Sequence, residues 1–535
     1  ATDLAGTNRI LVGDVDMGAY ERPPSTTLEC LFVADVTSVV APSDVVFTAT
    51  VSGGNTNITD YVWDFGDGQT TNSSTRAVVT NTYSAAGLYT VTLTVTNNAA
   101  ASASSTNTDY IAVWGDYAYV SASSPSPAEP YHTWANAAHT IADAISGAPV
   151  GATVAISNGT YNISEQIVVD KAITVTSFGD GIYGGLANAS NTVIDAIYGG
   201  SVSSGPRVFH ITDASAVLDG LTITGGTGRG DGTPGDPGNE DGNGIFMTGG
   251  LVQNCIIKEN GLATGYDHCQ GGGIYMAGGT VTNCTIQGNW TGAGTVHGGG
   301  IHATGGQILN SRILDNSIRA TGSGGGIYAT SGSVLIRNCL VADNTAQGNG
   351  GGIYGGTVES CTIVTNTAGA DGSGTGGGVY GSTVENSIVL NNDAGSGFDH
   401  DYASSTFSHS CSTPTPSGDG NIDTASFVDA AAGNYQLTAC PAVNFGTNQA
   451  WMVGATDLAG TNRILSGNVD MGAYERPPSS VLECLFLADV TSVVAPSNVV
   501  FTATVTGGNT NITDYAWDFG DGQTTNSSTR AVVTN

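Results

Sequence analysis

Apolar and polar residues alternate strictly in two stretches of the chain, VVFTATV at 45–51 and YTVTLTVT at 89–96. Alternation with a period of two is typical of strands that bury one face. Between these stretches, YVWDFGDGQ directs Trp63 and Phe65 to the same side of a strand. Residues 34–115 are therefore predicted to form a β-sandwich of short antiparallel strands.

A longer pattern follows, in which a Gly-Gly-Gly-Ile motif recurs with spacings of 29, 27, 26, 26 and 26 residues. Its aliphatic positions are Ile245, Ile274, Ile301, Ile327, Ile353 and Val379. A second motif keeps the same period and ends on Asn260, Asn289, Asn316, Asn344, Asn366 and Asn392. Two short strands per period, separated by glycine-rich turns, predict a β-solenoid whose coils stack about 4.8 Å apart.

Stacking places equivalent side chains of successive coils above one another. Each turn asparagine is expected to pair its amide with the copies above and below it. The same position of the repeat, which we call the cysteine slot, holds Cys255, Cys284, Cys339 and Cys361. We expect a ladder of buried thiols there rather than disulfides. Before the first coils, Ile141, Ala144 and Ile145 have the spacing of a short amphipathic helix.

Two known families carry these motifs. WDFGDG followed by YSAAGLYTVTLTVTN resembles the PKD domain, an immunoglobulin-like module common in surface proteins, in which Asp64 and Asp67 would cap turns. The GGGI and Asn motifs resemble polymorphic outer-membrane protein repeats, and residues after 139 resemble the start of pectin-lyase-like right-handed parallel β-helices. The motifs SCSTPTPSGDGNI at 410–422 and YQLTACPAVNFGTNQAWMVG at 435–454 resemble the closing segment of choice-of-anchor proteins, a resemblance that implies a Cys411–Cys440 disulfide. The implied fold class is all-β.

Residues 455–535 repeat residues 1–81 at a constant offset, with eight mild substitutions. A period this long indicates duplication of whole domains. We therefore interpret the sequence as a slice of a larger repetitive protein. The predicted organisation is a closing β-helix segment at 1–21, a linker at 22–33, the PKD sandwich at 34–115, the β-helix at 116–475, a linker at 476–487 and a truncated next PKD domain at 488–535.

The composition indicates where the protein is located and which partners it is expected to have. The net charge is −32 with 13 Lys and Arg residues, which disfavours nucleic acid and anionic membranes. No apolar run is long enough to span a bilayer. The sequence also contains no CxxC pair, so it does not indicate a zinc site. An acidic, lysine-poor chain with many Asn-x-Ser/Thr sites is expected to be extracellular or at the cell surface. The candidate glycosylation sites are Asn57, Asn72, Asn158, Asn162, Asn188, Asn283 and Asn289.

Polysaccharide cleavage requires a site, whatever the fold. The cations of the predicted β-helix do not share a slot. Asp315 and Asp343 occupy the slot before the turn asparagine on adjacent coils, and Glu259 occupies it two coils earlier. Such a pair could act in a retaining glycosidase or bind Ca²⁺, or simply be solvated. The inserted acidic loop offers a further set of candidate calcium ligands: Asp231, Asp236, Glu240 and Asp241.

Each GGGI motif is followed by a ring, and strand alternation directs these rings outward. The ring positions are Phe246, Tyr275, His302, Tyr328, Tyr354 and Tyr380. The five from Tyr275 onward are a candidate contact strip for sugars or another protein, and plain stacking accounts for them equally well.

The sequence thus predicts a non-enzymatic structural protein, an adhesive or matrix rod or filament. Its partners would be tandem or head-to-tail copies of itself. The alternative is a β-helix that binds or degrades polysaccharide.

Overall fold

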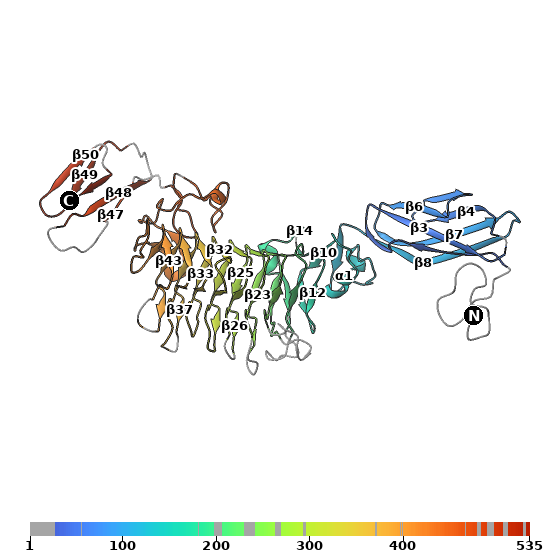
Figure 1. Cartoon of the computed structure of the whole chain (residues 1–535), viewed down its shortest axis with the longest axis horizontal. Helices are drawn as coiled ribbons and strands as arrows, with labels where there is room; N and C mark the ends of the chain where they lie inside the picture. The colour runs from blue at the N-terminus through green and yellow to red at the C-terminus, as the bar shows by residue number, and fades with distance from the viewer. Residues whose placement is uncertain are drawn as a thin grey trace, which may run out of the picture. The chain divides into compact units, whose positions relative to one another are not determined.

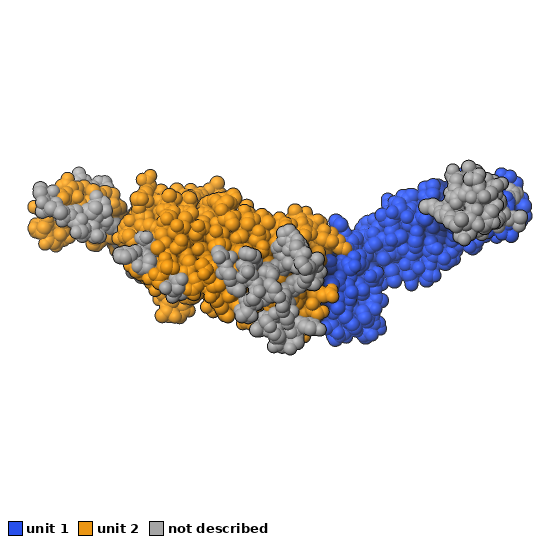
Figure 2. All heavy atoms as spheres, turned by 60° about the horizontal axis from the view of Figure 1, so that its bottom comes forward, with its two compact units in different colours: residues 1–157 blue, residues 158–535 orange. Residues whose placement is uncertain are grey.

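The computed structural model describes the chain from residue 27 onward, with gaps. The described residues are 27–54, 56–179, 181–196, 206–228, 241–262, 269–292, 296–369, 372–395, 397, 400–465, 467–478, 483–488, 497–506, 512–527 and 531–534. The chain divides into two compact units, residues 1–157 and residues 158–535 (Figure 2). The predicted closing segment at 1–21 lies outside the described residues.

The first unit contains a sandwich of two sheets. One sheet has the order β1-β3-β6 and the other has the order β2-β8-β7-β4-β5. The strands are β1 (Glu29–Ala34), β2 (Ser38–Val40), β3 (Ser43–Ser52), β4 (Ile58–Asp64), β5 (Thr70–Ser73), β6 (Val78–Tyr83), β7 (Gly87–Asn97) and β8 (Ser102–Trp114). Both alternating stretches of the sequence lie in strands, β3 and β7. The predicted linker at 22–33 extends too far, because Cys30 and Phe32 of β1 alternate into the core.

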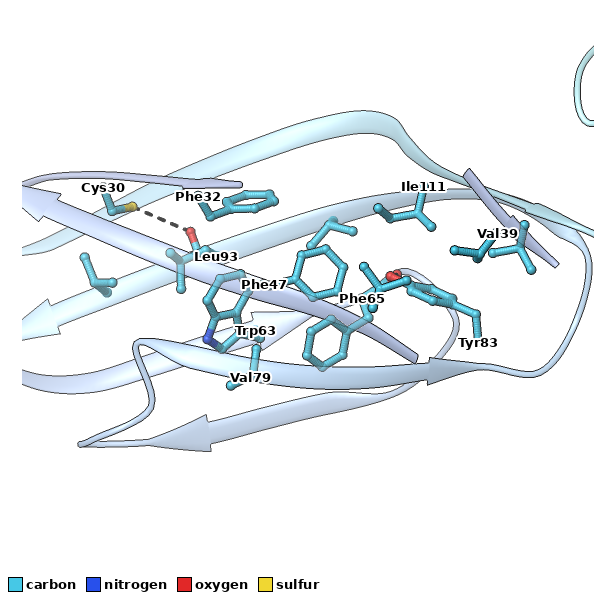
Figure 3. Close-up of a cluster of buried hydrophobic side chains, with 14 residues drawn as sticks. Cys30, Phe32, Val39, Phe47, Trp63, Phe65, Val79, Tyr83, Leu93 and Ile111 are labelled. Atoms are coloured by element: carbon cyan, nitrogen blue, oxygen red, sulfur yellow. Dashed lines mark hydrogen bonds between the residues drawn. The ribbon is translucent and has the colours of Figure 1, made fainter. Parts of the chain in front are cut away.

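Aromatic rings from both sheets fill the core between them (Figure 3). The Trp63 and Phe65 rings stack at 6.2 Å, and Phe32 meets Trp63 edge-on at 5.4 Å. Trp63 is fully buried. The core therefore gathers around the tryptophan of the WDFGDG motif.

The acidic residues of this motif hold turns. The Gly66 amide donates to the Asp64 carboxylate at 3.0 Å, and the Gln69 amide donates to Asp67 at 2.9 Å. Gly66 has φ +78°, and a Cβ there would collide with the Thr90 carbonyl oxygen. The predicted turn-capping role of Asp64 and Asp67 is confirmed.

The first unit ends with two parallel strands, β9 (Tyr117–Val120) and β10 (Thr153–Ser157), joined through η1 (Trp134–Asn136) and α1 (Ile141–Gly147). The predicted short helix is α1, and it buries Ile141, Ala144 and Ile145. Its N-cap is Thr140, whose hydroxyl accepts from the Asp143 amide at 3.1 Å.

The second unit contains a parallel β-helix, whose stacked coils are visible in Figure 1. Each coil contributes three main strands, so the prediction of two strands per coil is wrong. We name the three sheets the ring sheet, the middle sheet and the groove sheet. The ring sheet contains β12 (Ile167–Val169), β16 (Phe209–Ile211), β19 (Ile245–Met247), β23 (Ile274–Met276), β27 (Ile301–Ala303), β31 (Ile327–Ala329), β34 (Ile353–Tyr354), β38 (Val379–Tyr380) and β42 (Tyr402–Ala403). The middle sheet includes β13 (Thr174–Gly179), β17 (Val217–Asp219), β20 (Leu251–Gln253), β24 (Thr280–Thr282), β28 (Gln307–Leu309), β32 (Leu335–Arg337), β35 (Thr357–Glu359), β39 (Thr383–Glu385) and β43 (Thr406–Ser408).

The groove sheet comprises β11 (Gly159–Asn162), β15 (Thr192–Asp195), β18 (Thr222–Thr224), β21 (Ile256–Lys258), β25 (Thr285–Gln287), β29 (Arg312–Leu314), β33 (Leu340–Ala342), β36 (Thr362–Val364), β40 (Ile388–Leu390) and β44 (Cys411–Ser412). Shorter pairings join β22 (Gly261–Leu262), β26 (Trp290–Thr291) and β30 (Ser317–Ile318), and also β37 (Thr367–Ala368) and β41 (Asp393–Ala394). Beside the early coils lie β14 (Ile182–Tyr183) and α2 (Leu186–Ala189).

A left-handed backbone residue separates the middle strand from the groove strand of each coil. In TVTNCTI, Asn283 has φ +51° and turns the chain between β24 and β25. Asn254, Asn310 and Asn338 do the same in their coils. Asparagine tolerates this conformation better than most residues. Because only two residues separate β24 from β25, the two strands resemble one continuous strand in the sequence.

The turn asparagines form a buried ladder. The Asn289 side chain donates to the Asn316 Oδ1 atom at 3.0 Å, and Asn316 donates to Asn344 at 2.9 Å. Each amide also donates to a backbone carbonyl, such as Asn316 to Ile286 at 2.9 Å. At the last coil, Asn392 donates to the Asp401 carboxylate at 3.0 Å. The expected pairing with neighbouring copies is confirmed.

The cysteine slot forms a second ladder. The backbone amide of Cys255 donates to the Cys284 sulfur at 3.4 Å, and the amide of Cys361 donates to the Ser387 hydroxyl at 3.0 Å. Cys255, Cys284, Cys339 and Cys361 are free, buried thiols, as expected. Serine and cysteine can alternate in this slot because both offer one acceptor and one donor.

After the last coil, the chain returns along the groove sheet through β45 (Phe427–Asp429), η2 (Ala430–Ala432), β46 (Asn434–Leu437) and η3 (Ala450–Met452). A second set of sandwich strands follows: β47 (Glu483–Ala488), β48 (Val500–Thr506), β49 (Tyr515–Asp518), β50 (Thr524–Ser527) and β51 (Val532–Thr534). Glu483 pairs with Thr506 as Glu29 pairs with Ser52, so the repeated sequence reproduces the register. Since β47 begins at Glu483, the predicted linker at 476–487 is also too long.

Candidate functional site

A groove of about 790 Å³ lies between the groove sheet and the returning chain. Its apolar floor is formed by Leu314, Leu340 and Ala342 from β29 and β33. Tyr435 and Tyr474 of the returning chain also line it, and both are largely buried. An apolar floor with a few polar groups around it is the usual form of a small-molecule site.

The polar groups of the groove include the carboxylates that the sequence singled out. Asp315 and Asp343 both line it, and both are exposed. Because Leu314 pairs with Ala342 in register, the two aspartates lie on adjacent coils about one strand spacing apart. Each has a positive φ, +53° and +59°, so each occupies the turn that leaves its strand. Glu259 does not line this groove.

Arg312 connects the two walls of the groove. Its guanidinium donates to the Leu458 carbonyl oxygen at 3.1 Å. Burial raises the pKa of the Tyr474 hydroxyl, and the neighbouring Arg312 charge partly offsets this effect. Arg312 therefore positions the returning chain, and its charge is already shared with protein groups. The amides of Gln287, Asn434 and Gln436 complete the polar lining.

In the copy of the ATDLAGTNRIL motif at 455–465, the charged residues Asp457 and Arg463 are buried. The Arg463 guanidinium is fully buried, donates to the Gly472 carbonyl oxygen at 2.9 Å and lies 3.3 Å from a Glu475 carboxylate oxygen. Asp457 accepts from the backbone amides of Thr461 and Glu475, each at 2.7 Å. Burial raises the pKa of Glu475, and the Arg463 charge opposes that rise. The charged residues of this motif are thus used internally, to fold the returning chain.

The predicted calcium loop is only partly described. Asp231, Asp236 and Glu240 lie outside the described residues. Asp241 is described, and its carboxylate accepts from the Gln270 backbone amide at 2.8 Å. Among the residues that the structure describes, no three His, Cys, Asp or Glu side chains converge as a metal site requires. Calcium binding stays a prediction.

The candidate contact strip forms one continuous stack. Phe246 and Tyr275 lie 5.1 Å apart at 2°, and Tyr354 and Tyr380 lie 5.1 Å apart at 17°. His302 stacks between Tyr275 and Tyr328 at 5.0 and 5.2 Å. Because each ring covers the face of the next, edges rather than faces point outward. This geometry favours ladder stacking over sugar docking, which uses ring faces.

Two of the candidate glycosylation sites are unsuited to a glycan in the folded chain. Asn289 is fully buried in the asparagine ladder, and the Asn188 amide donates to the carbonyl oxygens of Ile182 and Gly184. A glycan on either nitrogen would displace these bonds. The remaining sites, Asn57, Asn72, Asn158, Asn162 and Asn283, are exposed.

The predicted Cys411–Cys440 bridge involves two residues of one buried cluster. Both are free thiols in the structure. Burial raises the pKa of Cys411, and the neighbouring Cys440 raises it further. The bridge stays a prediction that rests on resemblance.

Sequence reasoning found Asp315 and Asp343 but missed Arg312, Tyr435 and Tyr474. Tyr435 and Tyr474 come from a segment that contacts coils more than a hundred residues earlier, and no local period announces that contact. The only available signal was the concentration of charged residues in TDLAGTNRILSGNVDMGAYE, which is unusual for a chain with 11% charged residues.

Comparison with known proteins identifies the sandwich as a PKD domain. Residues 32–113 match the model of the PKD domain. The PKD1 domain of the Vibrio cholerae metalloprotease PrtV shares 34% identity and aligns with 16% of this chain and 98% of that chain, with a TM-score of 0.14. The pectate lyase Pel9A shares 16% identity and aligns with 67% of this chain and 96% of that chain, with a TM-score of 0.42. No curated protein matches the chain.

Within the described ranges, no helix has the length and apolarity needed to cross a bilayer. Residues 32–113 match the PKD model, and the stacked parallel sheets form a β-solenoid. The chain therefore joins a PKD domain to a parallel β-helix.

Proposed function

We propose that this chain is a repeating module of an extracellular structural protein, in which β-helices and PKD domains alternate to build a rod or filament with a role in adhesion or matrix. The observation that carries the proposal is the recurrence of residues 1–81 at 455–535. The second copy contains both the segment that closes the β-helix and the strands that begin the next sandwich. A duplicated junction of this kind gives every joint of a polymer the same structure.

The β-helix itself supports a mechanical role. Its ladders of asparagine and cysteine residues repeat the same hydrogen bonds from coil to coil. Stability that is repeated in every layer suits a stiff spacer. The acidic surface and the exposed Asn-x-Ser/Thr sites support an extracellular location.

Electron microscopy of the natural polypeptide tests the proposal. The ten-stranded groove sheet corresponds to about 50 Å of β-helix at about 4.8 Å per strand. With one sandwich added, the expected axial repeat is on the order of 100 Å. Discrete particles without any axial repeat would contradict the proposal, whether subunits join covalently or head to tail.

Polysaccharide cleavage is the rival function. The groove brings two exposed carboxylates near Arg312, whose guanidinium is engaged by the Leu458 carbonyl oxygen. Release of reducing ends from polysaccharides by the wild-type chain, lost in Asp343→Asn, would replace the structural proposal with an enzymatic one.

A further inference from the structure

We propose that the ring sheet carries a site of oxidative crosslinking, at which a one-electron oxidant joins tyrosines of adjacent coils as dityrosine. The site consists of Tyr328, Tyr354 and Tyr380, which we call the tyrosine triplet. In dityrosine, a covalent bond directly joins ortho carbons of two phenol rings. The inference goes beyond the structural role of the chain. It concerns a single chain, so it does not depend on filament formation.

The backbone holds the three tyrosines in register. Tyr328 pairs with Tyr354 across β31 and β34, and Tyr354 pairs with Tyr380 across β34 and β38. Paired side chains of parallel strands leave the sheet in the same direction, about 4.8 Å apart. The ring centroids of Tyr328 and Tyr354 lie 4.6 Å apart at 14°, and those of Tyr354 and Tyr380 lie 5.1 Å apart at 17°. Tyr354 therefore has a phenol ring against each of its two faces.

The triplet is open to an oxidant along one edge. All three rings are half-buried, because neighbouring rings cover their faces while their outer edges point away from the sheet. Burial raises the pKa of the Tyr328 hydroxyl, and the neighbouring Tyr354 raises it further, which places the two hydroxyls near each other. A half-exposed ring can tilt about its Cα–Cβ bond. Such a tilt brings the ortho carbons of two stacked rings within bonding reach.

The reaction balances with hydrogen peroxide as the oxidant and a peroxidase as the catalyst. Each of two tyrosines loses one electron and its hydroxyl proton and becomes a neutral phenoxyl radical, with spin on the oxygen and the ortho carbons. The two radicals form a bond between ortho carbons, and the hydrogen on each bonded carbon moves as a proton to the ring oxygen. The two electrons and two protons reduce one hydrogen peroxide to two waters. Stacking favours coupling within the chain, because it holds the partner phenol at a high effective concentration.

A histidine marks the boundary of the site. His302 stacks on Tyr328 at 5.2 Å and on Tyr275 at 5.0 Å, so it separates Tyr275 from the triplet. Tyr275 lies between Phe246 and His302, and neither of these rings is a phenol that could supply a second phenoxyl radical. Tyr275 thus belongs to the same stack and is half-buried like the triplet, but it should not crosslink to its stacked neighbours.

Treatment of the full chain with a peroxidase and hydrogen peroxide at low protein concentration tests the inference. The monomeric product is isolated by denaturing size-exclusion chromatography. Dityrosine is then measured by its fluorescence and by mass spectrometry of proteolytic peptides. We expect crosslinked peptides that join two members of the triplet, with a mass lower by two hydrogen atoms. In the chemically unfolded chain, the same treatment should distribute crosslinks among the other tyrosines, because the stack is lost.

Two phenylalanine variants separate the triplet from the other tyrosines, and Phe246 shows that this slot of the ring sheet accepts phenylalanine. Tyr354→Phe should abolish crosslinks within the triplet, because Tyr328 and Tyr380 lie two coils apart. Tyr275→Phe is the matched control and should leave their yield unchanged. The inference is overturned if the folded monomer forms no dityrosine, or if its crosslinks join only tyrosines outside the triplet. It is also overturned if Tyr354→Phe forms as much dityrosine as the wild type, or if unfolding leaves the crosslinking pattern unchanged.

Discussion

The sandwich and the β-helix bury their interiors in different ways. The sandwich packs rings from strands far apart in sequence around one residue, Trp63. The β-helix repeats a thin layer of small aliphatic side chains and adds a ladder of buried asparagines. The first arrangement concentrates stability at one place. The second distributes it, and every layer depends on the polar groups of the next. Substitutions should therefore act differently in the two regions.

The largest expected effect is at the sandwich core. Trp63→Ala removes a fully buried ring and should cost about 3–5 kcal/mol, enough to unfold most isolated sandwiches. In chemical denaturation, the sandwich transition should move to much lower denaturant while the β-helix transition stays in place. Val62→Ala is the matched control, since the second copy carries Ala516 at this position. Simultaneous loss of both transitions would show that the two regions do not unfold separately.

The β-helix should be most sensitive in its asparagine ladder. Asn316→Ala leaves the Asn289 backbone amide and side-chain amide without their shared acceptor. Two buried donors without partners should cost roughly 2–4 kcal/mol. Asn391→Gly is the control, because Asn391 is exposed and glycine keeps its positive φ. A melting temperature for Asn316→Ala equal to that of the control would refute the importance of the ladder.

The ring stack should make β-helix stability depend on pH. Burial, with a smaller contribution from His297, lowers the pKa of His302 from 6.5 to about 4. The folded state thus favours neutral His302, whereas the unfolded chain takes up a proton below pH 6.5. The associated stability is complete above pH 6.5 and is lost as the pH falls toward 4, up to about 3 kcal/mol.

His302→Phe isolates this effect, because Phe246 already occupies the same slot. Denaturation curves between pH 7 and 4 should show a smaller loss of stability for the variant than for the wild type. Equal losses would mean that other groups, such as carboxylates, account for the whole pH dependence.

The smallest expected effect is on the outer face of the ring sheet. Tyr354 stacks on Tyr328 at 4.6 Å and on Tyr380 at 5.1 Å. Tyr354→Ser should cost roughly 1–3 kcal/mol, since each of the two aromatic pairs contributes about 0.5–1.5 kcal/mol. Thermal melting measures this. A larger loss than that of Asn316→Ala would reverse the ranking of the inner and outer ladders.

The sequence predicted what is local and repeated. The alternation of apolar and polar residues predicted β3 and β7, and the period of the GGGI motif predicted the strands of the ring sheet. The sequence did not reveal the strands of the middle sheet as separate strands. In each coil, only a short corner with a left-handed residue such as Asn283 divides the middle strand from the groove strand. The sequence also did not reveal the walls of the groove. Tyr435 and Tyr474 approach β29 and β33 through folding of the returning chain, which depends on the buried Arg463 and Glu475 pair. Long-range contacts of this kind leave no period in the sequence.

X-ray fibre diffraction from aligned natural material tests the modular rod most directly. If β-helices lie end to end along the filament, their strands run across its axis and their coils stack along it. The account predicts a reflection near 4.8 Å on the meridian, together with an axial repeat on the order of 100 Å. A 4.8 Å reflection on the equator, or no long axial repeat, would contradict it.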